Sequence, residues 1–392
     1  MSHQGIQLMC DQSVRKAVLQ MVSALVPLDN QEKADIAFVK SWVESGAELV
    51  RLGKPNIPNI HLVSYFVVID ELSQECLLVD HKKSDLWLPP GGHVELGEHP
   101  KQTARREAKE ELGIEADFLF EDPFFLTVTE TVGEQEPHTD VSLWYILKGK
   151  KSQNFIYDVE EFHQICWFPW SEIPLEQSDP QMHRFIDKAL HKITTLNSYE
   201  ISANHYSINT ELLHPNVQAQ RFMEMLPRNA KILDIGCGPG RDAKIFSMKG
   251  FQVTGIDLSP KMIDIAKGSA LAASFHVMDI EALDFPEGSF DGLWVSASLL
   301  HVPKKNVPAV LKKMQRILRS NGVLYLSVKQ GADEILQEDA RYGGLSKFWS
   351  YFEEMELKKF VEESGFKVEK IEVLTKGSDY QTHPIICLFA SS

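Results

Sequence analysis

The alternation of apolar and polar residues changes along the chain, and it predicts which segments are helices and which are strands. Between residues 12 and 50, apolar residues recur every three or four positions, as in "VRKAVLQMVSALV" and "ADIAFVKSWVESGAELV", which predicts helices. "GKPNIPN" then interrupts the pattern. From His61 the apolar runs are short, as in "LVSYFVVI", "CLLVD", "FFLTVTETV", "VSLWYILK" and "QICWFPW", and they predict β-strands.

Two further helices interrupt and close this strand-rich region. Pro100 suits the first turn of a helix and Gly113 suits its C-terminal cap, so we expect a helix over residues 100–112. Residues 181–195, "QMHRFIDKALHKITT", predict a closing helix. Beyond them strands and helices alternate, with strands in "KILDIG", "FQVTGID", "ASFHVMD", "FDGLWVSAS" and "GVLYLSVK". This alternation predicts a parallel sheet covered on both faces.

These changes of pattern divide the chain of 392 residues into three parts. We assign residues 1–57 to an N-terminal helical extension, residues 58–196 to a first domain and residues 197–392 to a second domain. The sequence leaves open whether the N-terminal helices cap a substrate or mediate the contacts of a homodimer.

Charge and cysteine content narrow the classes of function. The formal net charge of -15 argues against bulk nucleic acid and against an anionic membrane as partners. The five cysteines are scattered and form no CxxC pair, which is typical of free thiols in a reducing compartment. The sequence shows no secretory signal and no apolar run of membrane-spanning length, so the expected location is the cytoplasm.

The helix expected at residues 100–112 carries a cluster of acidic residues in "RREAKEELG". Glu107, Glu110 and Glu111 stand at positions i, i+3 and i+4, so their carboxylates share one face. Like charges at this spacing repel one another. Two partners could compensate this repulsion. On an ordinary exposed helix face they would be solvent and Lys109, and at a metal site the partner would be a divalent cation.

The residues around the cluster favour the cation. Gly92, Glu98 and residues 106–114 complete the pattern G-x5-E-x7-R-E-U-x-E-E-x-G-U, with Ala108 at the aliphatic position. This pattern resembles the Nudix box, and the resemblance extends over about residues 58–175. It implies an α+β fold with a mixed sheet sandwiched by helices, and hydrolysis of a small-molecule diphosphate linked to another group.

The Nudix resemblance also implies ligands for a metal ion. Glu107, Glu110, Glu111 and the backbone carbonyl of Gly91 are expected to bind Mg²⁺ or Mn²⁺, because hard cations prefer oxygen ligands.

The same resemblance implies a supporting ion pair between Arg106 and Glu98. For the general base it leaves two alternatives. One is Glu107, and the other is a glutamate of the loop "YDVEEFHQ", Glu160 or Glu161, of which Glu161 is our candidate. The alternative is that this loop is an ordinary exposed acidic loop and has no catalytic role.

Several other side chains are candidates for substrate contact in the first domain. Four aromatic residues could either stack on a base of the substrate or be buried in the core. They are Phe66, Trp87, Trp144 and Trp167. His138 and Asp140 precede a strand near the expected cleft, where an ordinary polar turn is the alternative.

The second domain opens with a glycine cluster in "ILDIGCGPGRDA". Gly236, Gly238 and Gly240 follow a predicted strand, but a dinucleotide fingerprint would require Gly or Ala at the position of Arg241. The pattern G-x-G-x-G, preceded by Asp234, is instead similar to motif I of class I S-adenosylmethionine (SAM) methyltransferases. The resemblance covers about residues 199–390. It implies a Rossmann-like α/β fold, SAM as cofactor and a methyl acceptor that the motifs do not identify.

The methyltransferase resemblance implies which residues bind SAM. The glycine loop is expected to approach its methionyl and ribose parts, and Asp234 its ammonium group. Asp257 is expected to accept hydrogen bonds from both ribose hydroxyls. Asp279 is expected to bind the adenine amine, with Ile280 packed on the ring.

Three further positions have two readings each. His301 follows the fourth predicted strand of the domain and is either a general base or a structural or gating residue. Tyr199 and Tyr206 belong either to a lid over SAM or to linker packing. Cys237 is expected to be a small spacer.

Together the motifs predict a bifunctional enzyme, with diphosphate hydrolysis in the first domain and methyl transfer in the second. One alternative is processing and methylation of RNA ends, but the chain lacks a basic, aromatic-rich tract to hold a strand. The other alternative is that one domain acts only as a binding or regulatory module.

Overall fold

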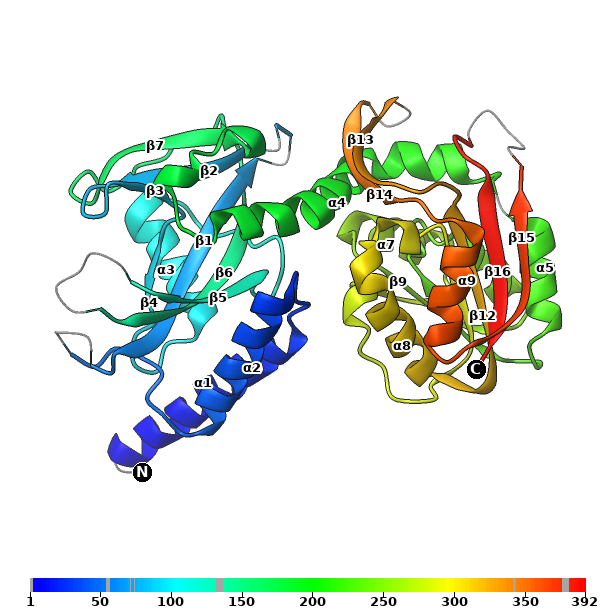
Figure 1. Cartoon of the computed structure of the whole chain (residues 1–392), viewed down its shortest axis with the longest axis horizontal. Coiled ribbons are helices and arrows are strands. Elements are labelled where there is room, and N and C mark those ends of the chain that lie inside the picture. Colours follow the sequence, from blue (N-terminus) through cyan, green and yellow to red (C-terminus); the bar gives the residue numbers. More distant parts are fainter. Residues whose placement is uncertain are drawn as a thin grey trace. The chain divides into compact units, whose positions relative to one another are not determined.

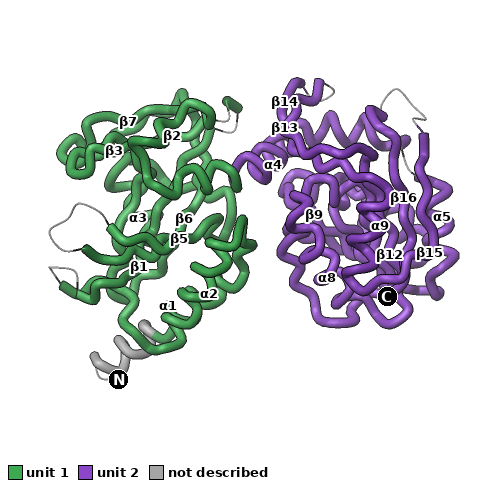
Figure 2. Tube along the Cα trace, viewed as in Figure 1, with its two compact units in different colours: residues 1–188 green, residues 189–392 purple. Residues whose placement is uncertain are grey.

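The structure of the chain is a computed structural model. It describes residues 3–53, 57–70, 72–73, 75–131, 137–213, 215–340, 343–375 and 381–392, with residues 3–11 described by their backbone alone. The chain divides into two compact units, Met1–Lys188 and Ala189–Ser392 (Figure 2), which we call unit 1 and unit 2. The division falls inside one continuous helix.

Unit 1 contains a seven-stranded sheet and the helices that pack on it (Figure 1). Its elements are α1 (His3–Ala24), α2 (Asn30–Glu44), β1 (Ile60–Asp70), β2 (Glu75–His81), β3 (Leu86–Leu88), β4 (Gly91–His93), α3 (Pro100–Leu112), β5 (Phe125–Glu130), β6 (Thr139–Gly149), β7 (Phe162–Pro169), two 3₁₀ turns (Trp170–Glu172 and Leu175–Gln177) and the first part of α4 (Met182–Thr210).

The sheet of unit 1 is mixed, as expected. The strand order is β3-β2-β1-β6-β5, with β4 beside β1 and β7 beside β2. The central pair β1 and β6 is parallel, whereas the other pairs are antiparallel. Helix α3 packs on β1, β4 and β6. On the opposite face, Phe185 of α4 stacks on Trp144 of β6, with ring centroids 5.3 Å apart. The sheet is thus sandwiched between helices.

The N-terminal helices are part of the hydrophobic core of unit 1. Val18 of α1 and Val43 of α2 are buried in the same cluster as Leu62 of β1 and Ala108 of α3. Glu32 of α2 is also buried, where it accepts from the amide of Leu28 and pairs with Lys188 of α4 at 2.7 Å. The extension therefore folds with the domain that follows it.

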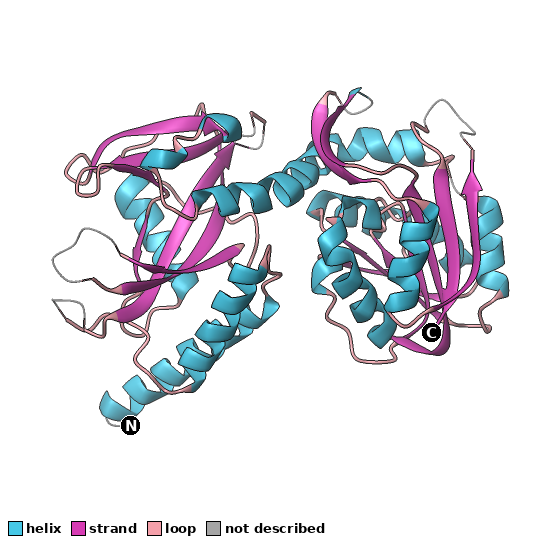
Figure 3. Cartoon of the chain, viewed as in Figure 1, coloured by secondary structure: helices cyan, strands magenta, loops and turns pink. Residues whose placement is uncertain are grey.

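Unit 2 contains a second seven-stranded sheet and a separate hairpin (Figure 3). Its elements are the remainder of α4, α5 (Asn216–Glu224), β8 (Lys231–Ile235), α6 (Arg241–Met248), β9 (Gln252–Asp257), α7 (Pro260–Ser269), β10 (Ser274–Val277), β11 (Phe290–Ser296), α8 (Val307–Ile317), β12 (Leu318–Lys329), β13 (Glu334–Asp339), β14 (Leu345–Ser350), α9 (Glu354–Glu363), β15 (Lys367–Leu374), β16 (Ile385–Ser391) and three 3₁₀ turns (Ile280–Ala282, Leu299–His301 and Lys304–Asn306).

The sheet of unit 2 has the order β10-β9-β8-β11-β12-β16-β15. The first five strands are parallel, and β16 runs antiparallel to both β12 and β15. The order reverses between β8 and β11, and ligands of such sheets bind beyond the carboxyl ends of the strands at this switch point. The glycine loop that follows β8 lies there.

Both faces of this sheet are covered, as the alternating pattern predicts. Leu233 of β8 belongs to the cluster formed with α8 and α9, whereas its neighbour Ile232 belongs to the cluster formed with α5, α6 and α7. Successive residues of a strand point to opposite faces, so one strand contributes to both cores. Figure 1 shows α5 and α9 on opposite sides of the strands.

Helix α4 is longer than the sequence pattern predicts. The expected closing helix over residues 181–195 continues to Thr210, through residues that lack strong helix-breaking signals. Its later turns are held by unit 2. For example, Thr195 Oγ1 accepts from the amide of Phe348 at 2.9 Å, and Glu200 accepts from the amide of Lys261 at 3.0 Å. Tertiary contacts here extend a helix that local sequence leaves undecided.

Among the helices in the described ranges, none combines the length and the apolar character that a membrane crossing needs.

Candidate functional sites

Helix α3 is capped at both ends in the way that its sequence indicates. His99 Nδ1 accepts from the amide of Lys101 at 3.1 Å, and Gln102 Oε1 accepts from the amide of His99 at 3.2 Å. Pro100 occupies the first turn, and Gly113 ends the helix in the left-handed region with φ 67°. These caps fix where the glutamates of the helix stand.

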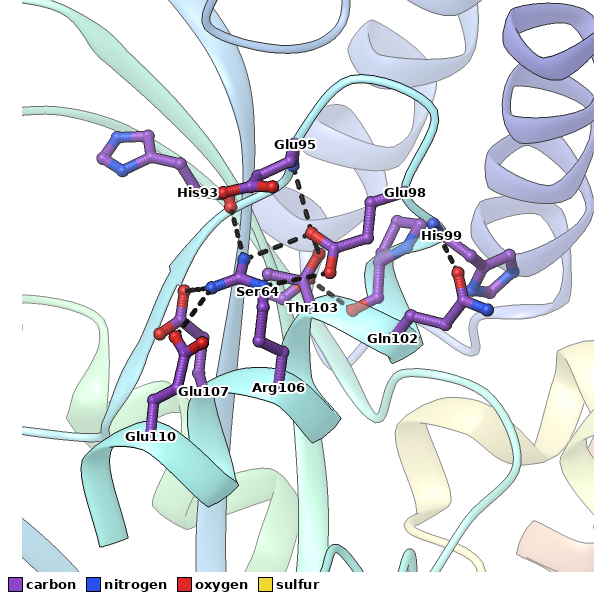
Figure 4. Close-up of polar contacts among 11 residues, drawn as sticks. Ser64, His93, Glu95, Glu98, His99, Gln102, Thr103, Arg106, Glu107 and Glu110 are labelled. Carbon is purple, nitrogen blue, oxygen red and sulfur yellow. Dashed lines mark hydrogen bonds and ion pairs between the residues drawn. The ribbon is translucent and has the colours of Figure 1, made fainter. Parts of the chain in front are cut away.

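Arg106 connects the acidic residues to the loop before the helix (Figure 4). Its guanidinium donates to both carboxylate oxygens of Glu98 at 3.1 and 3.2 Å, which confirms the expected ion pair. The same side chain donates to Glu107 at 2.7 Å and to Glu110 at 3.1 Å. Although burial opposes the shift, the hydrogen bonds from Arg106 and Thr103 hold the pKa of Glu98 below its ordinary value.

Glu111 is the most buried glutamate of the cluster, with 6% of its surface exposed. Its carboxylate accepts from the amide of Gly91 at 2.8 Å. Burial and the charges of Glu107 and Glu161 raise the pKa of Glu111 to about 9. Burial likewise raises the pKa of Glu107, although Arg106 opposes the shift. The site therefore concentrates more negative charge than Arg106 compensates.

The glycine pair before α3 allows the loop to lie against the helix. A Cβ at Gly92 would stand 2.0 Å from Glu107 Oε1, and a Cβ at Gly91 would stand 2.2 Å from the carbonyl oxygen of Ser64. The backbone of Ser64 excludes a side chain at Gly91, whereas a side chain at Gly92 would displace the carboxylate of Glu107. The amide of Gly91 is bound to Glu111, whereas the metal-binding role of its carbonyl stays a prediction.

The acidic loop after β6 reaches the helix through one of its two glutamates. The amide of Asp158 donates to the carbonyl of Glu111 at 3.0 Å, which anchors the loop. Glu161 lies close enough to raise the pKa of both Glu107 and Glu111, and it also stands 3.6 Å from His81 Nε2. Glu160 is exposed. The loop thus brings Glu161, the predicted candidate, toward the carboxylates.

The donor set on α3 fits a hard divalent cation. Three carboxylates on one helix and a fourth from the loop supply oxygen ligands, and the glycine pair leaves the space beside Glu107 free of side chains. Glu107, Glu110 and Glu111 are the residues that could hold such an ion. Burial and the neighbouring charges of Glu107 and Glu161 raise the pKa of Glu111, and a bound cation would oppose both effects.

The aromatic candidates of unit 1 divide into two groups. Phe66 and Trp144 are completely buried in the core and are therefore not available to stack on a substrate. Trp87 and Trp167 are partly buried: Trp87 packs edge-on against Phe168, and Trp167 packs against the core. The core interpretation is confirmed for the first two.

In unit 2 the glycine loop makes a tight turn beyond β8. Gly236, Gly238 and Gly240 have φ values of 72°, 53° and 81°, in the left-handed region that favours glycine. A Cβ at Gly236 would lie 2.3 Å from Ser298 Cβ, so this residue also permits the close approach of the turn after β11. At Gly238 the nearest atom would be a ring carbon of Tyr206 at 3.7 Å, so the loop is open there.

Asp257 at the end of β9 is bound to the glycine loop. One carboxylate oxygen accepts from the amide of Gly238 at 2.9 Å, and the other accepts from the amide of Ser259 at 2.9 Å. Burial raises the pKa of Asp257 to about 6, and these amides oppose the shift. Ser259, not Asp257, is the N-cap of α7. Asp257 therefore connects the ends of two neighbouring strands.

Asp234 lies inside β8, one strand position before the loop. It is 2% exposed, and among the described residues its Oδ2 atom has no hydrogen-bond partner. Burial, together with the charge of Asp242, raises the pKa of Asp234 well above its ordinary value. The structure places this carboxyl behind the glycine loop.

Asp279 and Ile280 follow β10, as the sequence order requires. Asp279 accepts from the amide of Glu281 at 2.9 Å and forms an ion pair with Lys192 of α4. Ile280 is partly buried against the core cluster of α8 and α9. The adenine contacts expected of these two residues stay predictions, and Lys192 is a neighbour that the motifs do not indicate.

His301 is enclosed by Tyr199 and the β13–β14 hairpin. Its Nδ1 lies 2.7 Å from the carbonyl of Phe348, and its Nε2 lies 2.9 Å from the hydroxyl of Tyr199. Because a carbonyl only accepts, Nδ1 carries the hydrogen and Nε2 accepts from the tyrosine. Burial lowers the pKa of His301 to about 3, with further lowering by the charges of Lys347 and Lys329.

Sequence motifs do not reveal the hairpin residues at this site. Lys347 of β14 is completely buried, with its Nζ 4.0 Å from the centroid of the Tyr199 ring and 5.9 Å from that of Tyr206. Tyr199 and Tyr206 meet edge to face at 5.3 Å. The only signal in the sequence is a lysine in the apolar run "LSKFWS".

Two family models match the chain. Residues 60–189 match the NUDIX domain, and residues 232–322 match the methyltransferase domain. The chain joins a NUDIX domain to a methyltransferase domain. Its first unit has the mixed-sheet architecture expected of the former, and its second has the Rossmann-like sheet expected of the latter.

Known proteins similar to the chain include methyltransferases. A phosphoethanolamine N-methyltransferase of Triticum aestivum is 26% identical over 252 residues, which is 62% of this chain and 47% of that protein. Phosphoethanolamine N-methyltransferase 1 of Arabidopsis thaliana is 30% identical over 186 residues, 46% of this chain and 35% of that protein. The chain thus spans half or less of the length of these relatives.

A solved structure of a SAM-dependent methyltransferase from Methanosarcina mazei is 23% identical, and the match covers 46% of this chain and 97% of that one. Its TM-score of 0.41 is too low to bear on the site.

Proposed function

We propose that the protein hydrolyses a small-molecule diphosphate with Mg²⁺ or Mn²⁺ in its NUDIX domain and transfers a methyl group from SAM to a small-molecule acceptor in its methyltransferase domain. The observation that carries the first activity is the convergence of Glu107, Glu110, Glu111 and Glu161. The observation that carries the second is Asp257, which is bound to the amide of Gly238 at the switch point of the sheet.

In the NUDIX domain, this chain's residues have distinct tasks. Glu107, Glu110 and Glu111 would hold the cation, which would supply Lewis-acid charge at the diphosphate oxygens. Arg106 and Glu98 fix the loop against the helix through their two-fold hydrogen bond. Glu161 accepts the proton of the attacking water, with Glu107 as the second candidate for this task.

In the methyltransferase domain, the residues position the donor. The amide of Gly238 orients the carboxylate of Asp257, which would accept from the ribose hydroxyls of SAM. SAM supplies the methyl group as a sulfonium, so positioning and exclusion of water are the main contributions of the protein. His301 is assigned as a positioning residue for Tyr199, because both of its ring nitrogens are engaged and its pKa is about 3.

The acceptor class is a second part of the proposal. Two of the relatives are named for N-methylation of phosphoethanolamine, and others are named for methylation of a hydroquinone or of a malonyl-acyl carrier protein. Phosphoethanolamine is therefore the first acceptor to test, with hydroquinones as the comparison. The net charge of -15 supports a small molecule over RNA.

The full chain tests both activities with crossed variants. Phosphate release is measured over a panel of nucleoside diphosphate derivatives with Mg²⁺, and SAM binding is measured by calorimetry. Glu111→Gln is expected to stop phosphate release and leave SAM binding unchanged. Asp257→Ala is expected to weaken SAM binding and leave phosphate release unchanged. If wild type releases no phosphate from any diphosphate while it binds SAM, the NUDIX domain is a binding or regulatory module.

A further inference from the structure

A second group of metal-ligand side chains converges in unit 1, apart from the glutamates of α3. It comprises His61 of β1, His93 of β4, His138 just before β6, and Asp140 of β6. Each offers one ligand atom, and the four atoms all lie within 4.8 Å of one another. The parallel pairing of β1 with β6 sets His61 directly opposite Asp140. We call these residues the His–Asp cluster.

The cluster lies on the face of the sheet opposite to the acidic helix. Ser64 Oγ donates to the carbonyl of Pro100 in α3 at 2.8 Å, so Ser64 faces that helix. Since side chains alternate along a strand, His61 points to the other face. Figure 4 shows the ring of His93 directed away from Arg106 and Glu98, although its carbonyl accepts from Arg106. The two groups of ligands are therefore separate.

Nδ1 of His61 and Nδ1 of His138 each have a hydrogen-bond partner in the protein, and Nε2 of each ring faces Asp140. Nδ1 of His61 lies 3.1 Å from the carbonyl of Pro58, which only accepts, so this nitrogen carries the hydrogen and Nε2 carries the lone pair. Nδ1 of His138 lies 3.0 Å from Thr131 Oγ1, whose hydroxyl donates to the carbonyl of His138. Such bonds to the outer nitrogen are how proteins orient metal-ligating histidines.

The inner ligand atoms of the cluster face one another among buried and partly buried side chains. Nε2 of His61 stands 3.3 Å from Asp140 Oδ1, and Nε2 of His138 stands 3.4 Å from the same oxygen. His61 is fully buried, and in the described ranges no hydrogen bond reaches Nε2 of His61, Nε2 of His93 or Oδ1 of Asp140. Buried acceptors that meet without a donor cost free energy unless a cation joins them.

We propose that the His–Asp cluster binds one Zn²⁺ ion, in a site distinct from that of the catalytic cation. Three imidazoles and one carboxylate suit zinc, which such ligands bind with bonds of about 2.0–2.2 Å in a tetrahedron. The edge of that tetrahedron is about 3.4 Å, and two of the ligand pairs already have this separation. Four protein ligands leave no open position, which is the pattern of a structural site.

The ion would hold together the beginning of β1, the end of β4 and the beginning of β6. The inference does not depend on the proposed hydrolysis, because no residue of the cluster belongs to the acidic helix. Its rival is a proton: a doubly protonated His61 or His138 that donates to Asp140 would satisfy the same atoms without a metal.

Titration of the metal-stripped full chain with Co²⁺ and Zn²⁺ distinguishes a bound metal ion from a bound proton. Excess Mg²⁺ is kept present so that the glutamates of α3 are occupied. We expect Co²⁺ to give the intense visible absorption of a tetrahedral complex, and Zn²⁺ to abolish it at about one ion per chain. Absence of that absorption, together with less than roughly one-tenth of an ion of zinc retained after gel filtration, overturns the proposal in favour of the proton.

Variants then assign the ligands. Asp140→Asn keeps the shape of the side chain, and His61→Asn removes one imidazole. Each is expected to weaken Co²⁺ and Zn²⁺ binding by at least about tenfold, because one ligand is lost or a water takes its place. The matched control is His163→Asn, at an exposed histidine of β7, which should change neither. Unchanged Co²⁺ affinity in both Asp140→Asn and His61→Asn would overturn the assignment of these ligands. Should a variant fail to fold, the wild-type titration still decides.

Discussion

The two proposed active sites are built in opposite ways. In unit 1 the decisive carboxylates stand on one helix, within five residues of one another, and they face too little positive charge. In unit 2 the residues come from the ends of β8, β9 and β11 and from the turn after β10, and the carboxylate of Asp257 is held by backbone amides. The first site is thus prepared for a cation, whereas the second is prepared for hydrogen-bonding groups.

This difference predicts that the two sites respond to different perturbations. Removing one charge should disable unit 1 while leaving its shape intact. Unit 2 should be sensitive to backbone changes in its loop and less sensitive to single charges.

The largest expected effect is that of Glu111→Gln on hydrolysis. Loss of this charge should lower Mg²⁺-dependent phosphate release by at least about 100-fold, because replacing groups that only support metal ligands already costs 10–100-fold. SAM affinity should not change. Glu115→Gln, at an exposed glutamate paired with Lys109, is the control and should behave like wild type. Near wild-type hydrolysis by Glu111→Gln would remove the ligand role.

The raised pKa of Glu111 predicts a pH dependence of stability in the metal-free protein. The folded pKa of about 9 exceeds the unfolded value of 4.5, so the native state holds the extra proton between these values. The stabilisation is complete below pH 4.5 and is lost as the pH rises, by up to about 1.4 kcal/mol per pH unit. Denaturant titrations of the full chain from pH 5 to pH 9 should show this decline in wild type for the unfolding of unit 1. Glu111→Gln should flatten it, and Mg²⁺ should reverse it in wild type only.

Gly236→Ala should be the most damaging single change in the loop of unit 2. It combines a left-handed φ of 72° with a Cβ 2.3 Å from Ser298 Cβ, and should cost at least about 2 kcal/mol of unfolding free energy. Gly250→Ala is the control, because Gly250 has φ 89° but no atom near the added Cβ. It should therefore show the cost of the left-handed backbone alone, about 1–2 kcal/mol of unfolding free energy. Equal losses in the two variants would mean that the contact with Ser298 relaxes freely.

Asp257→Ala should weaken SAM binding by at least about tenfold, because each charge-assisted hydrogen bond contributes about 1.5–3 kcal/mol. With a pKa of about 6, wild type should also lose SAM affinity below pH 6, by up to about tenfold per pH unit. Calorimetry at pH 5 and pH 7.5 measures both effects. Unchanged affinity with a lowered melting temperature would assign Asp257 to the connection between strands alone.

The smallest expected effect is that of His301→Gln on methyl transfer. A general base contributes about 10²–10⁴-fold, whereas a positioning residue with a pKa near 3 should contribute less than about tenfold. The shape of the pH–rate profile should be unchanged, and Tyr199→Phe should resemble His301→Gln. A loss of rate of about 100-fold or more, together with loss of the acidic limb of the profile, would show that His301 is a general base.

The sequence predicts the first site better than the second, for a physical reason. The positions of Glu107, Glu110 and Glu111 follow from helix periodicity, and the Arg106–Glu98 ion pair follows from the box pattern. The motifs of unit 2 indicate strand ends, but they do not indicate which distant side chains arrive there. Lys192 beside Asp279, and Lys347 beside Tyr199, come from α4 and from a hairpin without any motif.

The same limit applies to the His–Asp cluster. His138 and Asp140 stand out in the sequence as a polar turn before a strand, but only the pairing of β1 with β6 and with β4 adds His61 and His93 to them. Likewise, the sequence does not decide whether Phe66 and Trp144 are buried, because their burial depends on helices that cover the two faces of the sheet. Periodicity along the chain does not predict which distant strands pair, so it does not predict which side chains meet across them.

The continuous helix α4 has a practical consequence for any attempt to separate the two activities. A cut between residues 196 and 197, where the sequence pattern changes, would leave Lys192 and Thr195 on the wrong fragment, away from Asp279 and Phe348. A cut at the division between the units would instead place Lys188, the partner of Glu32, at a fraying terminus. Fragments that overlap, with residues 182–196 present in both, keep each domain's own ion pairs and are the ones to express.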